Sequence, residues 1–371
     1  MSQHPQPAAA IRAVPATTPF VAPEELARRV GRTSLVRLGA NESAFGPSPR
    51  ALAAMQAALP LVSLYGDPES VELRIALAAH HGCKIENIVV GSGVDELLGL
   101  ICRTYGAPGD PVLMSHGSYA TFAFQVIGHG LELHTVPPFP DGAVDIDAVL
   151  ARARELQPKI VYLANPDNPS GSFADRDDVV RLQAGLPPDT LFVLDEAYAH
   201  FVTSGSLLPD GIDERTIRLY TFSKAYGMAG ARVGYALASR EAIATFQKIR
   251  NHFGVNRTAQ IGALAALGDQ GFVREVVAEV ARGREEYHAF AQRIGVRTLP
   301  SQTNFVCFEI GTRQEAEAMM HALLERGVFV RKPGEPPING CIRVTVGTPV
   351  ERELFYEHFT AALDALRERV S

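Results

Sequence analysis

Residues 221–234 read Thr-Phe-Ser-Lys-Ala-Tyr-Gly-Met-Ala-Gly-Ala-Arg-Val-Gly, and this stretch decides the fold. Lys224 has hydroxyl residues before it and a run of small residues after it, which ends at Arg232. Such a lysine suits a Schiff-base amine beside a bound phosphate. Upstream, Asp195 ends an apolar run and Asn168 lies between two prolines. Pyridoxal phosphate needs a lysine for its aldehyde, an acid facing its ring nitrogen and donors for its phosphate, so these residues together predict a site for this cofactor.

The composition is that of an ordinary globular enzyme. The chain has 371 residues, enough for two lobes, and 46% of them are hydrophobic and 20% charged. Its net charge of -6 leaves no basic footprint, so we expect no nucleic-acid partner. No apolar run approaches the roughly 20 residues that span a bilayer, so we expect no membrane partner.

The cysteines and the N-terminal residues indicate the compartment. The four cysteines are widely spaced and form no C-x-x-C pair: Cys83, Cys102, Cys307 and Cys341. This spacing favours reduced thiols over a disulfide frame or a zinc site, and we expect no bound metal. The start of the chain lacks the basic head and long apolar stretch of a secretory signal. We therefore expect a cytoplasmic protein.

Short apolar runs alternate with helical stretches between about residues 84 and 240. The runs predict strands at 88–90, 111–114, 131–136, 160–163, 191–194, 218–221 and 233–237. Helices are expected near 94–105, 119–128, 145–156 and 175–185. Most runs are too apolar to have one wet face, which is typical of a sheet covered on both sides. The alternation predicts an α/β fold with a mostly parallel seven-stranded sheet between helices.

The pattern changes after about residue 258 and predicts a smaller α+β lobe. A helical run over 258–293 precedes a strand at 303–310, a helix ending at Gly327, strands at 328–331 and 341–346, and a final helix near 350–369. The expected domains are a flexible arm (1–22), a segment that joins the small domain (23–50), a large cofactor-binding domain (51–257) and a small domain (258–371).

Several candidate site residues follow predicted strands closely. Ligands of open α/β sheets bind beyond the carboxyl ends of the strands. Gly91, Asn168, Asp195 and Lys224 all stand at such positions. These signals therefore point to one edge of one sheet.

Lys224, Asp195 and Tyr198 are the predicted catalytic residues. A neutral lysine condenses with an aldehyde, and it then serves as general base and acid. Asp195 would keep the ring nitrogen of the cofactor protonated, although an aspartate after a strand also suits a helix N-cap. Tyr198 and Asn168 would hydrogen-bond the phenolic oxygen of the cofactor; alternatively Tyr198 is a packed core tyrosine and Asn168 belongs to a turn.

The stretch 91–96, Gly-Ser-Gly-Val-Asp-Glu, leaves a strand and opens a helix. Backbone N–H groups at a helix N-terminus bind phosphate, because the unpaired donors and the macrodipole both favour an anion. Arg232 would add charge and a forked donor pair. The predicted phosphate-binding residues are Gly93, Val94, Asp95, Thr221, Ser223 and Arg232.

Arg343 lies in the apolar strand Cys-Ile-Arg-Val-Thr-Val-Gly, where an unpaired charge would be costly. A substrate carboxylate bound by both arms of the guanidinium would pair it, and a structural salt bridge is the alternative. Arg331, in Val-Phe-Val-Arg-Lys, is less distinctive.

The chain resembles the fold-type I pyridoxal-phosphate aminotransferases from about Leu38 to Thr348, and within them it looks like the histidinol-phosphate aminotransferases. The matching motifs are Ala-Asn-Glu-Ser-Ala-Phe-Gly-Pro-Ser-Pro (40–49), Tyr-Gly-Asp-Pro (65–68), Gly-Ser-Gly-Val-Asp-Glu (91–96), Asn-Pro-Asp-Asn-Pro-Ser-Gly (165–171), Asp-Glu-Ala-Tyr (195–198), Ser-Lys-Ala-Tyr-Gly-Met-Ala-Gly (223–230) and Arg-Val-Thr-Val-Gly-Thr (343–348).

The resemblance implies further residues and a partner. Tyr119 would stack on the cofactor ring, and Tyr65 would reach the cofactor phosphate of a neighbouring subunit, which implies a homodimer with shared active sites. Arg343 would hold the substrate carboxylate, with Arg331 close to the substrate.

Two departures from that family bear on the substrate. The family usually has tyrosine where this chain has Phe45, and that hydroxyl helps bind a substrate phosphate. The stretch 251–257, Asn-His-Phe-Gly-Val-Asn-Arg, is more polar than the family leads us to expect. Arg257 would then compensate as a hydrogen-bond donor to a phosphate or carboxylate, or mark another substrate, and an aromatic amino acid aminotransferase is the main rival.

The activity that the residues and the resemblance imply is transfer of an amino group from an amine donor to a 2-oxo acid, most simply 2-oxoglutarate. Two alternatives stay open. A pyridoxal-phosphate decarboxylase of amino acid phosphates would use the same framework without an oxo-acid acceptor. A cofactor-sensing regulator would need an added DNA-binding segment, and the residues before the first motif leave little room for one.

Overall fold

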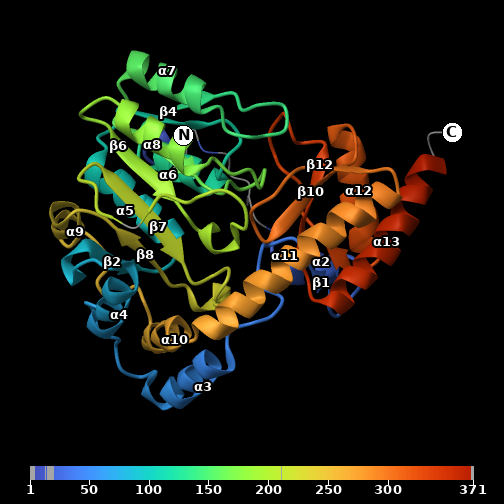
Figure 1. Cartoon of the computed structure of the whole chain (residues 1–371), viewed down its shortest axis with the longest axis horizontal. Helices are drawn as coiled ribbons and strands as arrows, with labels where there is room; N and C mark the ends of the chain where they lie inside the picture. The colour runs from blue at the N-terminus through green and yellow to red at the C-terminus, as the bar shows by residue number, and fades with distance from the viewer. Residues whose placement is uncertain (1–4, 13, 15–20, 210, 369–371) are drawn as a thin grey trace.

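A seven-stranded sheet forms the centre of the larger lobe (Figure 1). The computed structural model describes residues 5–12, 14, 21–209 and 211–368. In spatial order the strands are β2 (Ile88–Gly91), β8 (Gly234–Leu237), β7 (Thr216–Thr221), β6 (Leu191–Asp195), β5 (Ile160–Ala164), β3 (Pro111–Ser115) and β4 (Glu132–Val136). Strand β8 alone runs opposite to the other six strands. The predicted mostly parallel sheet is confirmed.

Helices cover both faces of this sheet because its strands are apolar on both sides. Val112 and Met114 of β3 belong to the core cluster that includes residues of α5, α6 and α9, whereas Leu113 belongs to the cluster that includes residues of α7 and α8 on the opposite face. The covering helices are α5 (Val94–Tyr105), α6 (Ala120–Gly128) and α9 (Arg240–Phe246) on one side, and α7 (Ile146–Leu156) and α8 (Arg176–Gly185) on the other. Successive side chains of a strand point to opposite faces, so a strand buried on both sides lacks the alternation of a half-exposed one.

The second lobe has two small sheets covered by long helices (Figure 1). Its elements are α2 (Pro23–Arg29), β1 (Val36–Arg37), β9 (Arg297–Thr298), β10 (Phe305–Glu309), α12 (Arg313–Glu325), β11 (Val328–Phe329), β12 (Cys341–Thr345) and α13 (Pro349–Glu368). Strand β1 pairs in parallel with β11, which brings the N-terminal segment to this lobe. The strand predicted over 328–331 is shorter than expected, because beyond Phe329 only Arg331 forms an isolated bridge, with Arg343.

The single helix predicted over 258–293 is wrong. The structure has two helices, α10 (Arg257–Leu267) and α11 (Gln270–Arg293), separated by Gly268 and Asp269. The carboxylate of Asp269 accepts a hydrogen bond from the N–H of Phe272 and so caps a new helix, as short polar residues commonly do.

The helices before and after this break pack differently. α10 packs against α3 (Pro49–Ala58) and α4 (Val71–His81), while α11 runs from there to the second lobe (Figure 1). The division into domains at residues 51–257 and 258–371 stays a prediction.

Part of the predicted N-terminal arm lies outside the described residues, namely 1–4, 13 and 15–20. Within the arm, α1 (Ala9–Arg12) packs near α6. Among the described helices, none is both long and apolar enough to cross a bilayer.

Candidate active site

The carboxyl ends of four strands bring the predicted residues to one edge of the sheet. β5, β6 and β7 are neighbours and run parallel, and β2 points the same way because β8 is antiparallel to both β2 and β7. Asn168 follows β5, Asp195 ends β6, Lys224 follows β7, and Gly93 follows β2. The strand order therefore gathers residues that are far apart in the sequence.

Lys224 reaches from this edge toward the second lobe. Its Nζ donates to the backbone oxygen of Asn41 at 3.1 Å and lies 5.6 Å from the ring centre of Tyr198. The side chain is partly buried. The amine thus stands between the two lobes, with an aromatic face beside it.

Asp195 is a buried carboxylate that accepts hydrogen bonds from two donors. The hydroxyl of Tyr162 donates to Oδ2 at 2.9 Å, and the N–H of Ala197 donates to Oδ1 at 3.0 Å. Burial nevertheless raises the pKa of Asp195 to about 6, because the two neutral donors do not replace the water lost by the charge. A cation opposite this carboxylate would offset the cost of its charge.

A continuous set of hydrogen bonds joins the two lobes behind Lys224. Arg343 donates to the side-chain oxygen of Asn168, whose Nδ2 lies 3.5 Å from the hydroxyl of Tyr198. That hydroxyl also accepts from Nδ2 of Asn41 at 2.9 Å. The predicted residues Asn168, Tyr198 and Arg343 are therefore in one network, which ends at the oxygen that Lys224 contacts.

A second group of residues forms a cup at the start of α5. Gly93 has a φ of 84°, and a Cβ added there would lie 2.4 Å from a guanidinium nitrogen of Arg232. Arg232 and the hydroxyl of Tyr119 both donate to the carboxylate of Asp95, at 3.4 and 2.7 Å. Val94 and Asp95 are the first residues of the helix, where the backbone N–H groups point outward.

Thr221 and Ser223 lie beside this cup. The hydroxyl of Thr221 accepts from the backbone N–H of Ser223 at 3.0 Å, and both residues are buried. Arg232 has the left-handed φ of 59°, which is costly outside glycine and is often found at functional sites.

Four further residues were predicted for the site, and each has contacts of its own: Arg331, Phe45, Arg257 and Tyr65. Arg331 donates to the backbone oxygen of Val21 at 3.1 Å, and its backbone pairs with Arg343. Phe45 is partly buried against the core. Arg257 donates to the backbone oxygen of Tyr65, whose side chain is exposed.

Two residues of the site were missed. Asn41 holds Lys224 and Tyr198 from the second lobe, and it lies in the motif 40–49, where the sequence predicted only Phe45 as a site residue. Its φ of 54° suits asparagine, which tolerates the left-handed region better than most residues. Tyr162 donates to Asp195, yet in the sequence it looks like one more apolar residue of a strand. Only the three-dimensional neighbours of these two residues reveal their function.

The donors present fit pyridoxal phosphate. The α5 N-terminus and Arg232 suit a phosphate, and buried Asp195 suits a protonated ring nitrogen. Among the described residues, Nε of Arg343 is buried with no hydrogen-bond partner. Such a donor indicates an anion that this site would take up, since buried polar groups are normally paired.

Comparisons with known proteins agree with this geometry. Residues 33–359 match the family model "Aminotransferase class I and II". A histidinol-phosphate aminotransferase of Sphingopyxis alaskensis is 39% identical, covering 89% of this chain and 91% of that protein, and one of Bacillus licheniformis is 34% identical, covering 92% and 94%. The crystal structure of histidinol-phosphate aminotransferase from Sinorhizobium meliloti, in complex with pyridoxal 5'-phosphate, is 41% identical with a TM-score of 0.93, covering 98% of this chain and 99% of that one.

Proposed function

The chain belongs to the class I and II aminotransferases, and on that premise we propose that it transfers the amino group of histidinol phosphate to 2-oxoglutarate, a step of histidine biosynthesis. The observation that carries the proposal is the meeting of Lys224, Asp195 and the α5 N-terminus at one sheet edge. A lysine, a buried acid and a phosphate cup are what pyridoxal-phosphate chemistry requires.

Pyridoxal phosphate supplies an aldehyde for the amine and a ring that withdraws electrons from the reacting carbon. Asp195 holds a proton on the ring nitrogen, which in turn stabilises the buried carboxylate. Tyr198 and Asn168 would hold the ring by hydrogen bonds to its phenolic oxygen, and Tyr119 would stack on the ring. The residues proposed to hold the phosphate are Gly93, Val94, Asp95, Thr221, Ser223 and Arg232, together with Tyr65 of a second copy.

Lys224 moves the proton in this proposal. Its Nζ removes a proton from the amine-bearing carbon of the donor and later returns one to the carbon of the acceptor. The contacts to Asn41 and to the Tyr198 ring support the proposal because they hold the amine between the lobes, where a substrate would enter.

Arg343 is the proposed anion site of the substrate. Its guanidinium already donates to Asn168 and to the backbone oxygen of Gly39, while Nε stays without a partner among the described residues. The carboxylate of 2-oxoglutarate would accept two parallel hydrogen bonds from such a fork. Arg331 stands next to it through the β-bridge and adds positive charge for a second anionic group.

The choice between donors depends on the phosphate of histidinol phosphate. Phe45 lacks the hydroxyl that the family usually offers to this phosphate. Arg257 has a buried Nε with no partner among the described residues, and we propose that it supplies the missing donor. The aromatic amino acid aminotransferases remain the second candidate, because Phe45 would equally suit an aromatic side chain.

A donor screen tests this function. With 2-oxoglutarate as acceptor, histidinol phosphate is expected to give a kcat/KM at least about tenfold above that of phenylalanine or tyrosine, the factor that one charge-assisted contact provides. Glutamate formation measured for each donor checks it. A preference for phenylalanine or tyrosine would favour an aromatic amino acid aminotransferase instead. Release of CO2 from either amino acid in the absence of an acceptor would contradict transamination.

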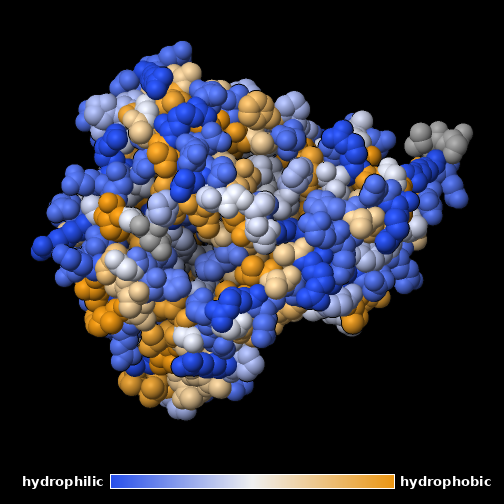
Figure 2. Space-filling model, viewed as in Figure 1, coloured by the Kyte–Doolittle hydropathy of each residue, from blue (hydrophilic) through white to orange (hydrophobic). Residues whose placement is uncertain are grey.

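We further propose a homodimer with shared sites. Large apolar side chains are exposed on one part of the surface, around α3, η1 (Leu59–Leu61) and the start of α4. Hydrophobic residues gather over α3 in Figure 2. The residues are Leu52, Leu59, Leu61, Val62, Leu64, Tyr65, Val71, Ile75 and Phe253. Contiguous apolar surface of this kind commonly marks an interface, and Tyr65 lies within it.

Val62→Glu is expected to shift the protein from dimer to monomer. Val62 is 72% exposed, and in a buried interface the new carboxylate would lose its water without gaining a partner. Sedimentation velocity checks the change. Val350→Glu is the matched control, because Val350 is 71% exposed but lies on α13. Equal dimer content in both variants would contradict this interface.

We propose a cytoplasmic location for the enzyme. All four cysteines are free, and three of them are buried in apolar surroundings. Reduced thiols of this kind are typical of a reducing compartment.

A further inference from the structure

Tyr65 is held in place mainly by its backbone. Its residue is 78% exposed, and its ring has one ring neighbour among the described residues, Phe253, at 4.8 Å between centres. Its backbone oxygen accepts from Arg257. A long side chain with so few contacts keeps a defined direction only if the chain on either side is fixed.

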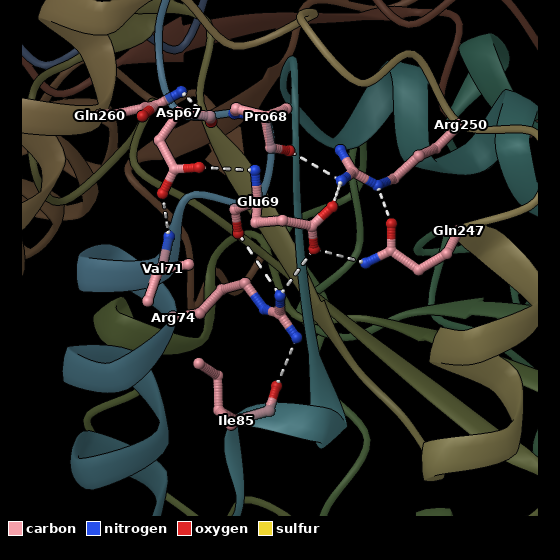
Figure 3. Close-up of polar contacts among 9 residues, drawn as sticks. All are labelled: Asp67, Pro68, Glu69, Val71, Arg74, Ile85, Gln247, Arg250 and Gln260. Atoms are coloured by element: carbon pink, nitrogen blue, oxygen red, sulfur yellow. Dashed lines mark hydrogen bonds and ion pairs between the residues drawn. The ribbon is translucent and has the colours of Figure 1, made fainter.

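The chain directly after Tyr65 is fixed by the carboxylate of Glu69 (Figure 3). This carboxylate accepts from Arg250 at 2.7 Å, from Arg74 at 3.1 Å and from Nε2 of Gln247 at 3.1 Å. Arg74 belongs to α4, and Gln247 and Arg250 follow α9. One carboxylate therefore ties together two segments that are about 180 residues apart.

Further hydrogen bonds extend this group along the same turn (Figure 3). Arg250 also donates to the backbone oxygen of Pro68 at 2.7 Å. The side chain of Asp67 accepts from the N–H groups of Glu69 and Val71, which begins α4, and Gln260 donates to the backbone oxygen of Asp67. Every residue from 67 to 69 thus has a partner in another element or in the helix that follows.

The two arginines make this arrangement depend on Glu69. The side chains of Arg250 and Arg74 are only 6% and 11% exposed, whereas that of Glu69 is 43% exposed. Removing the carboxylate would leave two largely buried cations without their shared anion, which favours separation of the two segments.

The segment that follows α9 includes the residues that contact Tyr65. Arg250 begins the stretch 250–257, which includes both Phe253 and Arg257. The Glu69 group thus fixes Tyr65 from one side, and through Arg250 it fixes the two residues that contact Tyr65 from the other side.

We propose that Glu69, with Arg74, Gln247 and Arg250, is a positioning group that presents Tyr65, Phe253 and Arg257 as one unit to the active site of a second copy of the chain. This inference rests on the proposed homodimer with shared sites. Glu69 contributes to cofactor binding in its partner's site and not in its own.

The first measurement is the Kd for pyridoxal phosphate of the full-length protein. Glu69→Gln is expected to weaken binding by about tenfold, equal to about 1.4 kcal/mol. Gln247→Ala, which leaves both ion pairs in place, should weaken it by a smaller factor, and Glu69→Asp should recover most of the loss.

The matched control is Glu286→Gln. Glu286 is 41% exposed and pairs with Arg352, which is 2% exposed, so it resembles Glu69 but lies in the second lobe. It is expected to leave the Kd unchanged even if it lowers the thermal midpoint. A loss of cofactor affinity that simply follows the thermal midpoint across all variants would contradict positioning.

A heterodimer separates the two subunits. Glu69→Gln and Lys224→Ala chains with different tags are co-expressed and the mixed dimer is purified. In the mixed dimer, the one active site that has Lys224 is completed by Tyr65 from the subunit with an intact Glu69. About half of the wild-type activity is therefore expected, and that site should have the wild-type Kd. A Kd as weak as that of the Glu69→Gln homodimer would overturn the proposal, because Glu69 would then act within its own subunit.

These measurements also distinguish the positioning group from the proposed function on which it rests. A wild-type protein that is monomeric or transfers no amino group contradicts the proposed function. An active wild-type dimer whose Glu69→Gln variant binds the cofactor normally contradicts only the positioning group.

Discussion

Lys224→Ala is expected to lower kcat for amino transfer by at least about 10³-fold, since it removes both the cofactor's covalent partner and the proton-transferring amine. The substitution leaves the donors of the phosphate cup and Asp195 in place. The variant should therefore still bind pyridoxal phosphate but fail in turnover. Single-turnover and steady-state assays with the same donor check this.

Two observations make the test of Lys224 specific. After borohydride reduction, mass spectrometry should find the cofactor attached to the peptide with Lys224 in the wild type and to no lysine in the variant. Lys159→Ala, at an exposed position between α7 and β5, is the control and should keep full activity. Full activity of Lys224→Ala, or a cofactor attached to another lysine, would contradict the assigned mechanism.

The residues that could be predicted from the sequence are those next to strand ends. Asp195 ends the apolar run of β6 and Lys224 stands three residues after β7, and the parallel order of β6 and β7 brings these two strand ends together. Local sequence marks a strand end well, because an apolar run stops abruptly at a polar residue. Their role as a pair then followed from the needs of one cofactor.

The residues that could not be predicted depend on contacts between distant segments. Asn41 is 183 residues from Lys224, and it is held in the second lobe by the pairing of β1 with β11 and by hydrogen bonds to Asn304 and Thr345. Arg218 lies in the middle of β7, yet it is a buried partner of Glu196 at 2.6 Å. No period or spacing in the sequence indicates either pair, since each is created by the packing of separate elements.

The break in the helix predicted over 258–293 has a different cause. Its apolar residues continue on both sides of Gly268 and Asp269, so periodicity alone favours one helix. Asp269 caps the next helix, and α10 turns away to pack on α3. The sequence allows an N-cap at Asp269, but it allows a continuous helix equally well. Tertiary packing decides between the two.

Asp195→Asn is expected to make the cofactor-free protein more stable while lowering kcat by about 10²- to 10³-fold. Asparagine has nearly the same shape: its oxygen can accept from the N–H of Ala197, and its amide can donate to the hydroxyl of Tyr162, which then turns its own proton elsewhere. The amide carries no charge and cannot hold a proton on the ring nitrogen. The loss of activity and the gain of stability thus have one origin.

The pH dependence of stability gives the sign of this effect. The unfolded carboxyl titrates near its ordinary value of 3.8, whereas burial raises the folded pKa to about 6. Between these values the folded state binds more protons, so the contribution of Asp195 to the free energy of unfolding falls as pH rises. This loss of unfolding free energy is complete above about pH 6, and its upper estimate is about 3 kcal/mol.

Denaturant unfolding of the cofactor-free wild type and Asp195→Asn between pH 4 and 8 measures this difference. The variant should gain stability over the wild type as pH rises from about 4 to 6, and the gap should stay constant above that range. Saturating pyridoxal phosphate should narrow the gap, because a protonated ring nitrogen pairs with the aspartate but not with the asparagine. A gap that does not change with pH, or that widens with the cofactor, would mean that Asp195 does not face the ring nitrogen as a buried charge.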